Sequence, residues 1–217
     1  MTIRYHADDS TLMSYAAGAL PEALSAVVAT HVRMCARCRK ELATLEMLGG
    51  AVLAKLPHAN SPMSTANPTN DVALAMEPVS PRPGGNAPRS DAAAVLSRLT
   101  DDGLTTVPWR RLAPGVWHYP LRLSPGSKGD LRLFKVAPGQ TMPVHGHGGT
   151  ELTLMLHGSY TDENGRFDLG DLADLDQEHE HAPSADPKTG CICLIASEQK
   201  ARYKGLLARL LQPFIGI

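Results

Sequence analysis

The stretch Gly139–Gly158 reads GQTMPVHGHGGTELTLMLHG, and it decides how the C-terminal half of the chain folds. Its spacing is G-x5-H-x-H-x3-E-x6-G, in which His145, His147 and Glu151 are the side chains of metal-binding type. Two histidines that lie two residues apart on a strand point to the same side of a sheet. The pair Gly148-Gly149 permits a local distortion that brings Glu151 to the same centre. The stretch therefore predicts a metal site within β-structure.

Short strand-like segments surround this motif. Apolar residues alternate with period two over residues 117–123, 130–136, 151–157 and 191–195. Turn pairs punctuate them at Pro125-Gly126, Pro138-Gly139, Asn164-Gly165 and Gly170-Asp171. Many short strands with regular turns are typical of a small antiparallel barrel or jelly roll.

The motif resembles the first motif of the cupin superfamily, whose second motif supplies one more histidine after a glycine turn. Here Gly170 is followed by His179 and His181, and then by Pro183. The position relative to Pro183 assigns His181 as the fourth ligand, with His179 on the same strand face as the alternative. Three imidazoles and one carboxylate can hold zinc, or manganese, iron or nickel with open positions. The alternative interpretation is a solvated loop that binds no metal.

A second group of ligand-type residues lies near the N-terminus, where His31, Cys35 and Cys38 have the spacing H-x3-C-x2-C. All three can converge whether the segment is helical or broken at the cysteines. Two thiolates and an imidazole suit tetrahedral zinc, which takes a fourth protein ligand in structural sites. His6 is the one remaining histidine before the proline-rich region. The alternatives are buried thiols and a redox-active pair, although the strand–helix context of the latter is missing.

Helical patterns flank these ligands over residues 9–17, 21–32 and 39–48, and Gly49-Gly50 is expected to end the last one. Three short helices bury little apolar surface, so a metal ion is expected to staple them. Prolines from residue 57 to residue 90 indicate a linker, with short helices expected over 71–76 and 91–99. The predicted organisation is multi-domain α + β: a zinc-binding helical domain over 1–56, extending to about 77 at most, a linker over 57–100 and a metal-binding barrel over 101–217.

Composition and charge exclude several classes of partner. The 217 residues carry a formal net charge of -1, so no basic excess exists to bind phosphates. Direct nucleic-acid binding, and with it a zinc-finger transcription factor, is therefore not expected. No apolar stretch approaches the roughly 20 residues that cross a bilayer, and the N-terminus does not look like a signal peptide. We expect a cytoplasmic protein that contacts no membrane.

Two further features have competing interpretations. Cys191 and Cys193 share one strand face, and we expect them to belong to an apolar core, with oxidant sensing as the alternative. The acidic residues between Asp162 and Glu180 predict a solvated loop face, with contact to a basic surface of a partner protein as the alternative.

The two halves together resemble the ChrR-type anti-sigma factors, which join a zinc anti-sigma domain to a cupin domain. The segments that carry the resemblance are Met1-Thr2-Ile3-Arg4, Val28-Ala29-Thr30-His31, Glu151-Leu152-Thr153-Leu154 and Cys191-Ile192-Cys193-Leu194. The chain departs from that pattern where the fourth anti-sigma helix is expected, because this region is rich in proline here.

This resemblance implies that the helical domain binds an extracytoplasmic-function (group IV) sigma factor and blocks its access to core RNA polymerase. The resemblance also implies that the sigma factor is released in response to singlet oxygen or related oxidants such as organic hydroperoxides. The first zinc would be held by His6, His31, Cys35 and Cys38, and the second metal by His145, His147, Glu151 and His181. Neither site need be catalytic.

An enzyme is the main alternative. Three histidines and a glutamate also serve oxygen chemistry, so the barrel is compatible with a dioxygenase or isomerase that carries an accessory zinc domain. A metal ion with open coordination positions in a polar pocket would favour the enzyme. Four protein ligands closed around the ion would favour a structural or sensory role.

Overall fold

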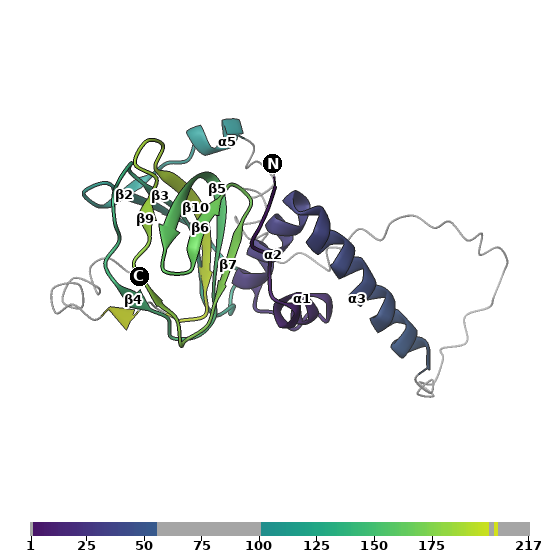
Figure 1. Cartoon of the computed structure of the whole chain (residues 1–217). Helices are drawn as coiled ribbons and strands as arrows, with labels where there is room; N and C mark the ends of the chain where they lie inside the picture. The colour runs from purple at the N-terminus through teal and green to yellow at the C-terminus, as the bar shows by residue number, and fades with distance from the viewer. Residues whose placement is uncertain (1, 56–100, 200–201, 204–217) are drawn as a thin grey trace.

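The structure is a computed structural model that describes residues 2–55, 101–199 and 202–203. Three N-terminal helices, α1 (Asp9–Ala16), α2 (Glu22–Met34) and α3 (Ala36–Lys55), lie beside an antiparallel barrel that α5 (Asp101–Thr105) leads into (Figure 1). The predicted combination of a helical unit and an antiparallel barrel is confirmed. The predicted linker over 57–100, with its helices over 71–76 and 91–99, lies outside the described residues.

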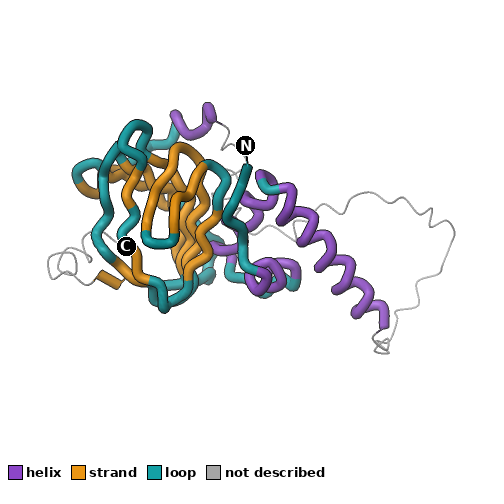
Figure 2. The backbone as a smooth tube through the Cα atoms, viewed as in Figure 1, coloured by secondary structure: helices purple, strands orange, loops and turns teal. Residues whose placement is uncertain are grey.

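The barrel strands are β1 (Arg110–Ala113), β2 (Val116–Pro120), β3 (Asp130–Val136), β4 (His145–Gly146), β5 (Glu151–Asp162), β6 (Gly165–Asp168), β7 (Leu172–Leu175), β8 (Glu180–His181), β9 (Ser184–Ala185), β10 (Cys191–Ser197) and β11 (Arg202–Tyr203). The main sheet has the order β1-β2-β3-β10-β5-β6, and β7 and β9 also pair with β5. A smaller sheet has the order β11-β4-β8. Figure 2 shows the strands gathered at one side and α1–α3 at the other.

The four predicted strands are present as β2, β3, β5 and β10, and β5 is five residues longer than expected. Gly158 allows this extension because its φ of +64° lets the strand bend and continue. A Cβ at Gly158 would lie only 2.1 Å from the carbonyl oxygen of Gly190, so glycine is required at this close approach. The strands β4, β8 and β9 have two residues each, which is too short to give an alternating pattern.

Two sequence-based predictions are wrong. Gly49-Gly50 do not end the third helix, which starts at Ala36 and continues to Lys55. Each glycine costs about 1 kcal/mol relative to alanine, and the helix-forming residues on both sides tolerate that cost. The acidic stretch 162–180 is not a solvated loop, because it contains β6 and β7 and the fully buried Asp171.

The N-terminal helices and the barrel share one apolar core. In α2, the side chains of Leu24, Val27 and Val28 are 0–1% exposed, and they belong to the same cluster as Leu154 and Leu194 of the sheet. Burial of each such side chain stabilises the fold by about 2 kcal/mol. The barrel therefore holds α2 in place independently of any metal ion.

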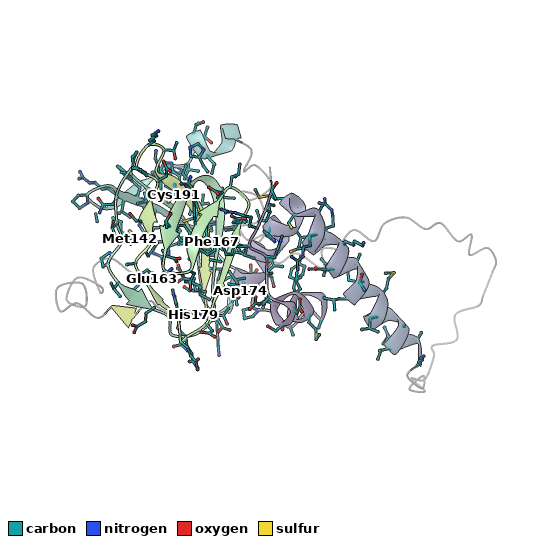
Figure 3. The ribbon with its side chains drawn as sticks, in the orientation of Figure 1. Met142, Glu163, Phe167, Asp174, His179 and Cys191 are labelled. Carbon is teal, nitrogen blue, oxygen red and sulfur yellow. The ribbon has the colours of Figure 1, made fainter. Side chains whose placement is uncertain are left out.

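The segment before α1 runs along β7 and fastens the same interface. Leu172 N donates to Tyr5 O at 3.2 Å, and Asp8 N donates to Asp174 Oδ2 at 3.0 Å. Figure 3 shows Asp174 on the side of the barrel that faces the helices. Asp171 accepts hydrogen bonds from Arg4 N at 2.6 Å, from Tyr5 N at 3.2 Å and from Asp168 N at 2.9 Å. The acidic residues of this stretch thus act as acceptors for backbone groups.

A second apolar cluster fills the opposite face of the sheet, inside the barrel. It includes Phe134, Met155 and Phe167, together with Cys191 and Cys193, which are each 5% exposed. The expectation that these two cysteines belong to an apolar core is confirmed.

Among the described residues, no helix is both long enough and apolar enough to cross a membrane.

Candidate metal centres

The structure brings His6, His31, Cys35 and Cys38 together, with one ligand-type atom from each lying within 4.8 Å of the others. Cys35 Sγ lies 3.3 Å and Cys38 Sγ 3.5 Å from His6 Nδ1, and His31 Nε2 lies 3.3 Å from Cys38 Sγ. Ligand bonds of about 2.0–2.3 Å around tetrahedral zinc place neighbouring nitrogen and sulfur atoms roughly 3.3–3.8 Å apart. The donor atoms and their separations therefore fit one zinc ion.

The break between two helices creates this geometry. Helix α2 ends at Met34, Cys35 is extended with φ -103° and ψ 108°, and α3 begins at the next residue. His31 therefore projects from the last turn of α2 and Cys38 from the first turn of α3. Of the two arrangements that the sequence left open, the structure has the one in which the helix is broken at Cys35.

The barrel supplies the group that orients His31. The Nδ1 atom of His31 lies 3.1 Å from the carbonyl oxygen of Gly170, a residue in the turn between β6 and β7. This hydrogen bond leaves Nε2 directed at Cys38, which is the arrangement by which proteins orient metal-binding imidazoles. Gly170 carries no side chain, so no pattern in the sequence indicates this contact.

Burial alters the protonation of two side chains at this site. Burial lowers the pKa of His31 to about 4, so the imidazole is neutral and has a lone pair to donate. Burial raises the pKa of the Cys38 thiol to about 12. A divalent ion offsets that penalty by stabilising the thiolate, so metal binding at this site releases protons.

The second cluster lies at one end of the barrel and combines His145, His147, Glu151 and His181, all 2–9% exposed. His145 pairs with His181 across β4 and β8, and their Nε2 atoms are 3.2 Å apart. His147 Nδ1 lies 3.2 Å from Glu151 Oε2. Burial by itself raises the pKa of Glu151, but the adjacent imidazole of His147 lowers it overall, which favours the carboxylate.

Hydrogen bonds hold two of these rings in the orientation of metal ligands. His145 Nδ1 lies 2.9 Å from Pro143 O, and His181 Nδ1 lies 2.8 Å from Oδ2 of the buried Asp162 carboxylate. Both rings therefore direct Nε2 inward. Among the described residues, neither nitrogen of His147 has a partner of hydrogen-bond geometry, despite the short distance to Glu151. A buried imidazole without partners is costly, and a metal ion removes that cost.

His179, the alternative fourth ligand, lies outside this cluster. Its side chain is 48% exposed, and its Nδ1 lies 2.7 Å from Asp176 Oδ1. Sequence reasoning did not find Asp162, because a carboxylate in a strongly acidic stretch looks like part of a solvated surface.

An aromatic stack connects the barrel interior with the N-terminal centre. The ring of Tyr160 stacks on Phe167 with centroids 4.8 Å apart, and Phe167 packs against Tyr5 at 4.3 Å. Tyr5 directly precedes His6. This stack and the hydrogen bond between His31 and Gly170 therefore connect the N-terminal centre with the barrel.

Comparison with known proteins agrees with this architecture. Residues 103–201 match the ChrR cupin-like domain family. The chain is 40% identical over 220 residues to the anti-sigma-E factor ChrR of Cereibacter sphaeroides, with all of both chains covered.

Two solved structures are similar to this chain. The ChrR chain in the crystal structure of Rhodobacter sphaeroides SigE in complex with the anti-sigma factor ChrR aligns with a TM-score of 0.67 and 36% identity, over 90% of this chain and 100% of that one. An RmlC-like cupin from Ralstonia eutropha aligns with a TM-score of 0.41 and 22% identity, over 46% of this chain and 68% of that one. On the full-length identity, this chain belongs to the ChrR family of anti-sigma factors.

Proposed function

We propose that this protein sequesters an extracytoplasmic-function sigma factor and keeps it from core RNA polymerase. The relative of known structure is bound to SigE. In this chain, the proposal rests on an apolar stripe along α3. The stripe is buried near the start of the helix and exposed toward its C-terminal end.

Leucine and valine side chains follow one face of α3 at helical spacing. Leu42 is 9% exposed and Leu45 is partly buried in the shared core. The same face continues with Leu48 and Val52, which are 61% and 56% exposed. Figure 1 shows this end of α3 projecting away from the barrel. An exposed apolar stripe on a helix is suited to a partner protein, because burial of that stripe drives helix-in-groove association.

Metal ions support this function in our proposal. Zinc at His6, His31, Cys35 and Cys38 joins α2 to α3 and so fixes the direction of the exposed stripe. Zinc or another divalent ion binds at His145, His147, Glu151 and His181. Four protein ligands are typical of structural or sensory zinc, so we propose a regulatory role without catalysis. The division into a helical unit over 1–56, a linker over 57–100 and a barrel over 101–217 is part of this proposal.

Release of the sigma factor is proposed to begin in the barrel. Oxidative chemistry at the barrel metal would act on the N-terminal centre through the contacts of Gly170 and Tyr5. The interface between the barrel and the N-terminal helices can transmit such a change only if its structure differs between the sigma-bound form and the released form. Since sigma factors act on RNA polymerase, the proposed site of action is the cytoplasm.

Substitution of Leu48 and Val52 by aspartate tests the docking surface. Because two large apolar contacts are lost and two charges are introduced, we expect binding of the partner sigma factor to weaken by about 100-fold or more. Isothermal titration calorimetry with the purified sigma factor measures this change.

Val144→Asp is the matched control, since Val144 is 49% exposed but lies on the barrel. The control is expected to bind as the unchanged protein does. Equal affinity of the α3 double variant and the unchanged protein would contradict the proposed surface.

A further inference from the structure

The interior of the barrel contains a cavity of about 320 Å³ next to the second metal cluster. Three of the cluster residues, His145, Glu151 and His181, line it. Its apolar wall comes from Phe134, Val136, Met142, Cys191, Cys193 and Ile195. The exposed side chains of Glu198 and Gln199 mark its polar, solvent-facing end. A concave apolar space with a few polar groups is the usual form of a small-molecule site.

Tyr160 lines this cavity and supplies a polar group that is not satisfied. The residue is 4% exposed, and among the described residues its hydroxyl is buried without a hydrogen-bond partner. Stacking on Phe167 fixes the ring, so the hydroxyl cannot turn toward solvent. Burial raises the pKa of Tyr160, so the group is a neutral hydroxyl that can donate a hydrogen bond. An unpartnered buried hydroxyl is costly, and a ligand oxygen would remove that cost.

Charges around the cavity indicate the charge of the ligand. Asp130, Glu151 and Glu198 carry three negative charges, and Arg132, which is ion-paired with Asp130, carries one positive charge. A divalent ion bound at the histidine–glutamate cluster would balance the remaining two. The cavity therefore has no excess charge with which to attract an ion, and burial of an uncompensated charge is expensive.

We propose that the barrel cavity binds a small, uncharged and mainly apolar organic molecule whose oxygen accepts a hydrogen bond from Tyr160. An apolar cavity of about half this size is large enough to hold benzene in an engineered protein. One aromatic or short aliphatic group with a single oxygen therefore fits the space and the available donor. This inference does not depend on sigma-factor binding.

Benzyl alcohol and toluene are suitable probes, because they share an aromatic body and differ in the hydroxyl group. Their dissociation constants are measured by NMR titration of the metal-loaded full chain, with methyl signals of Met142 and Ile195 reporting on the cavity. We expect benzyl alcohol to bind about three- to tenfold more tightly than toluene, since one neutral hydrogen bond contributes that much.

Tyr160→Phe removes the hydroxyl alone. We expect it to abolish the preference for benzyl alcohol, to leave toluene binding unchanged and not to lower the melting temperature, because the hydroxyl makes no hydrogen bond in the described residues. Ile195→Phe, which fills the cavity, should weaken both probes. The proposal is overturned if the unchanged protein shows no cavity shifts with either probe, or if the preference persists in Tyr160→Phe.

Discussion

Replacing Cys38 by serine is expected to empty the N-terminal centre and to loosen α1 and α3, while α2 stays on the barrel. Serine removes a sulfur atom that lies close to both His6 and His31. Structural zinc sites contribute roughly 10 kcal/mol or more to small metal-dependent units, so the loss is large for α1 and α3, which place few side chains in the shared core. Helix α2 is different, because Val27 and Val28 are buried in the core that it shares with the sheet.

Zinc analysis and hydrogen exchange measure this outcome. We expect about one ion less per chain and faster amide exchange in α1 and α3, with little change in α2. Cys191→Ala is the matched control, since it removes a buried thiol that belongs to the barrel interior. Retention of the ion and unchanged exchange in Cys38→Ser would contradict the assignment of this ligand.

Asp171→Asn is expected to lower the free energy of unfolding by about 3 kcal/mol. The buried carboxylate accepts hydrogen bonds on both oxygens, from Arg4 N and Tyr5 N on Oδ1 and from Asp168 N on Oδ2. An asparagine presents an NH₂ group to one side of this arrangement and leaves a backbone donor unpaired. Since His6 follows Tyr5, the N-terminal centre should also bind its ion more weakly.

Urea unfolding of the metal-loaded protein measures this effect. Asp168→Asn is the control, because Asp168 also contacts Arg4 but its side chain is 44% exposed. An exposed ion pair of this kind contributes about 1 kcal/mol or less. Similar losses of stability in the two variants would mean that Asp171 does not fasten the N-terminal segment.

Local spacing accounts for what the sequence could predict. His31, Cys35 and Cys38 lie within eight residues, and His145, His147 and Glu151 within seven, so the chemistry of the donors is visible in the chain itself. The predicted fourth members, His6 and His181, needed only an argument about position. The structure brings both of them into their clusters.

Contacts over long sequence separations account for what could not be predicted. The apolar stripe of α2 is visible in the sequence, but its partners Leu154 and Leu194 lie more than 100 residues away and carry no mark of that pairing. The carbonyl of Gly170 orients His31 without any side chain. Asp171 looks like part of a solvated acidic stretch, because charge patterning does not distinguish a buried acceptor of backbone hydrogen bonds from a surface carboxylate.

These long-range contacts couple the N-terminal centre to the barrel. If the metal-binding helical unit were joined to the barrel only by a linker, its stability would depend only on its own ion. Here His31 and the segment with His6 are positioned by β6, β7 and the turn between them. The state of the barrel and the occupancy of the N-terminal centre are therefore thermodynamically linked, and each should alter the stability of the other.

We propose that the N-terminal ion shapes a surface that captures a sigma factor. The most direct measurement is binding of the partner sigma factor to the full chain before zinc removal, after complete removal by a chelator, and after zinc is restored. We expect the complex to be lost when the metal is removed and to be recovered when zinc is restored. A complex that persists with both centres shown to be metal-free would contradict it.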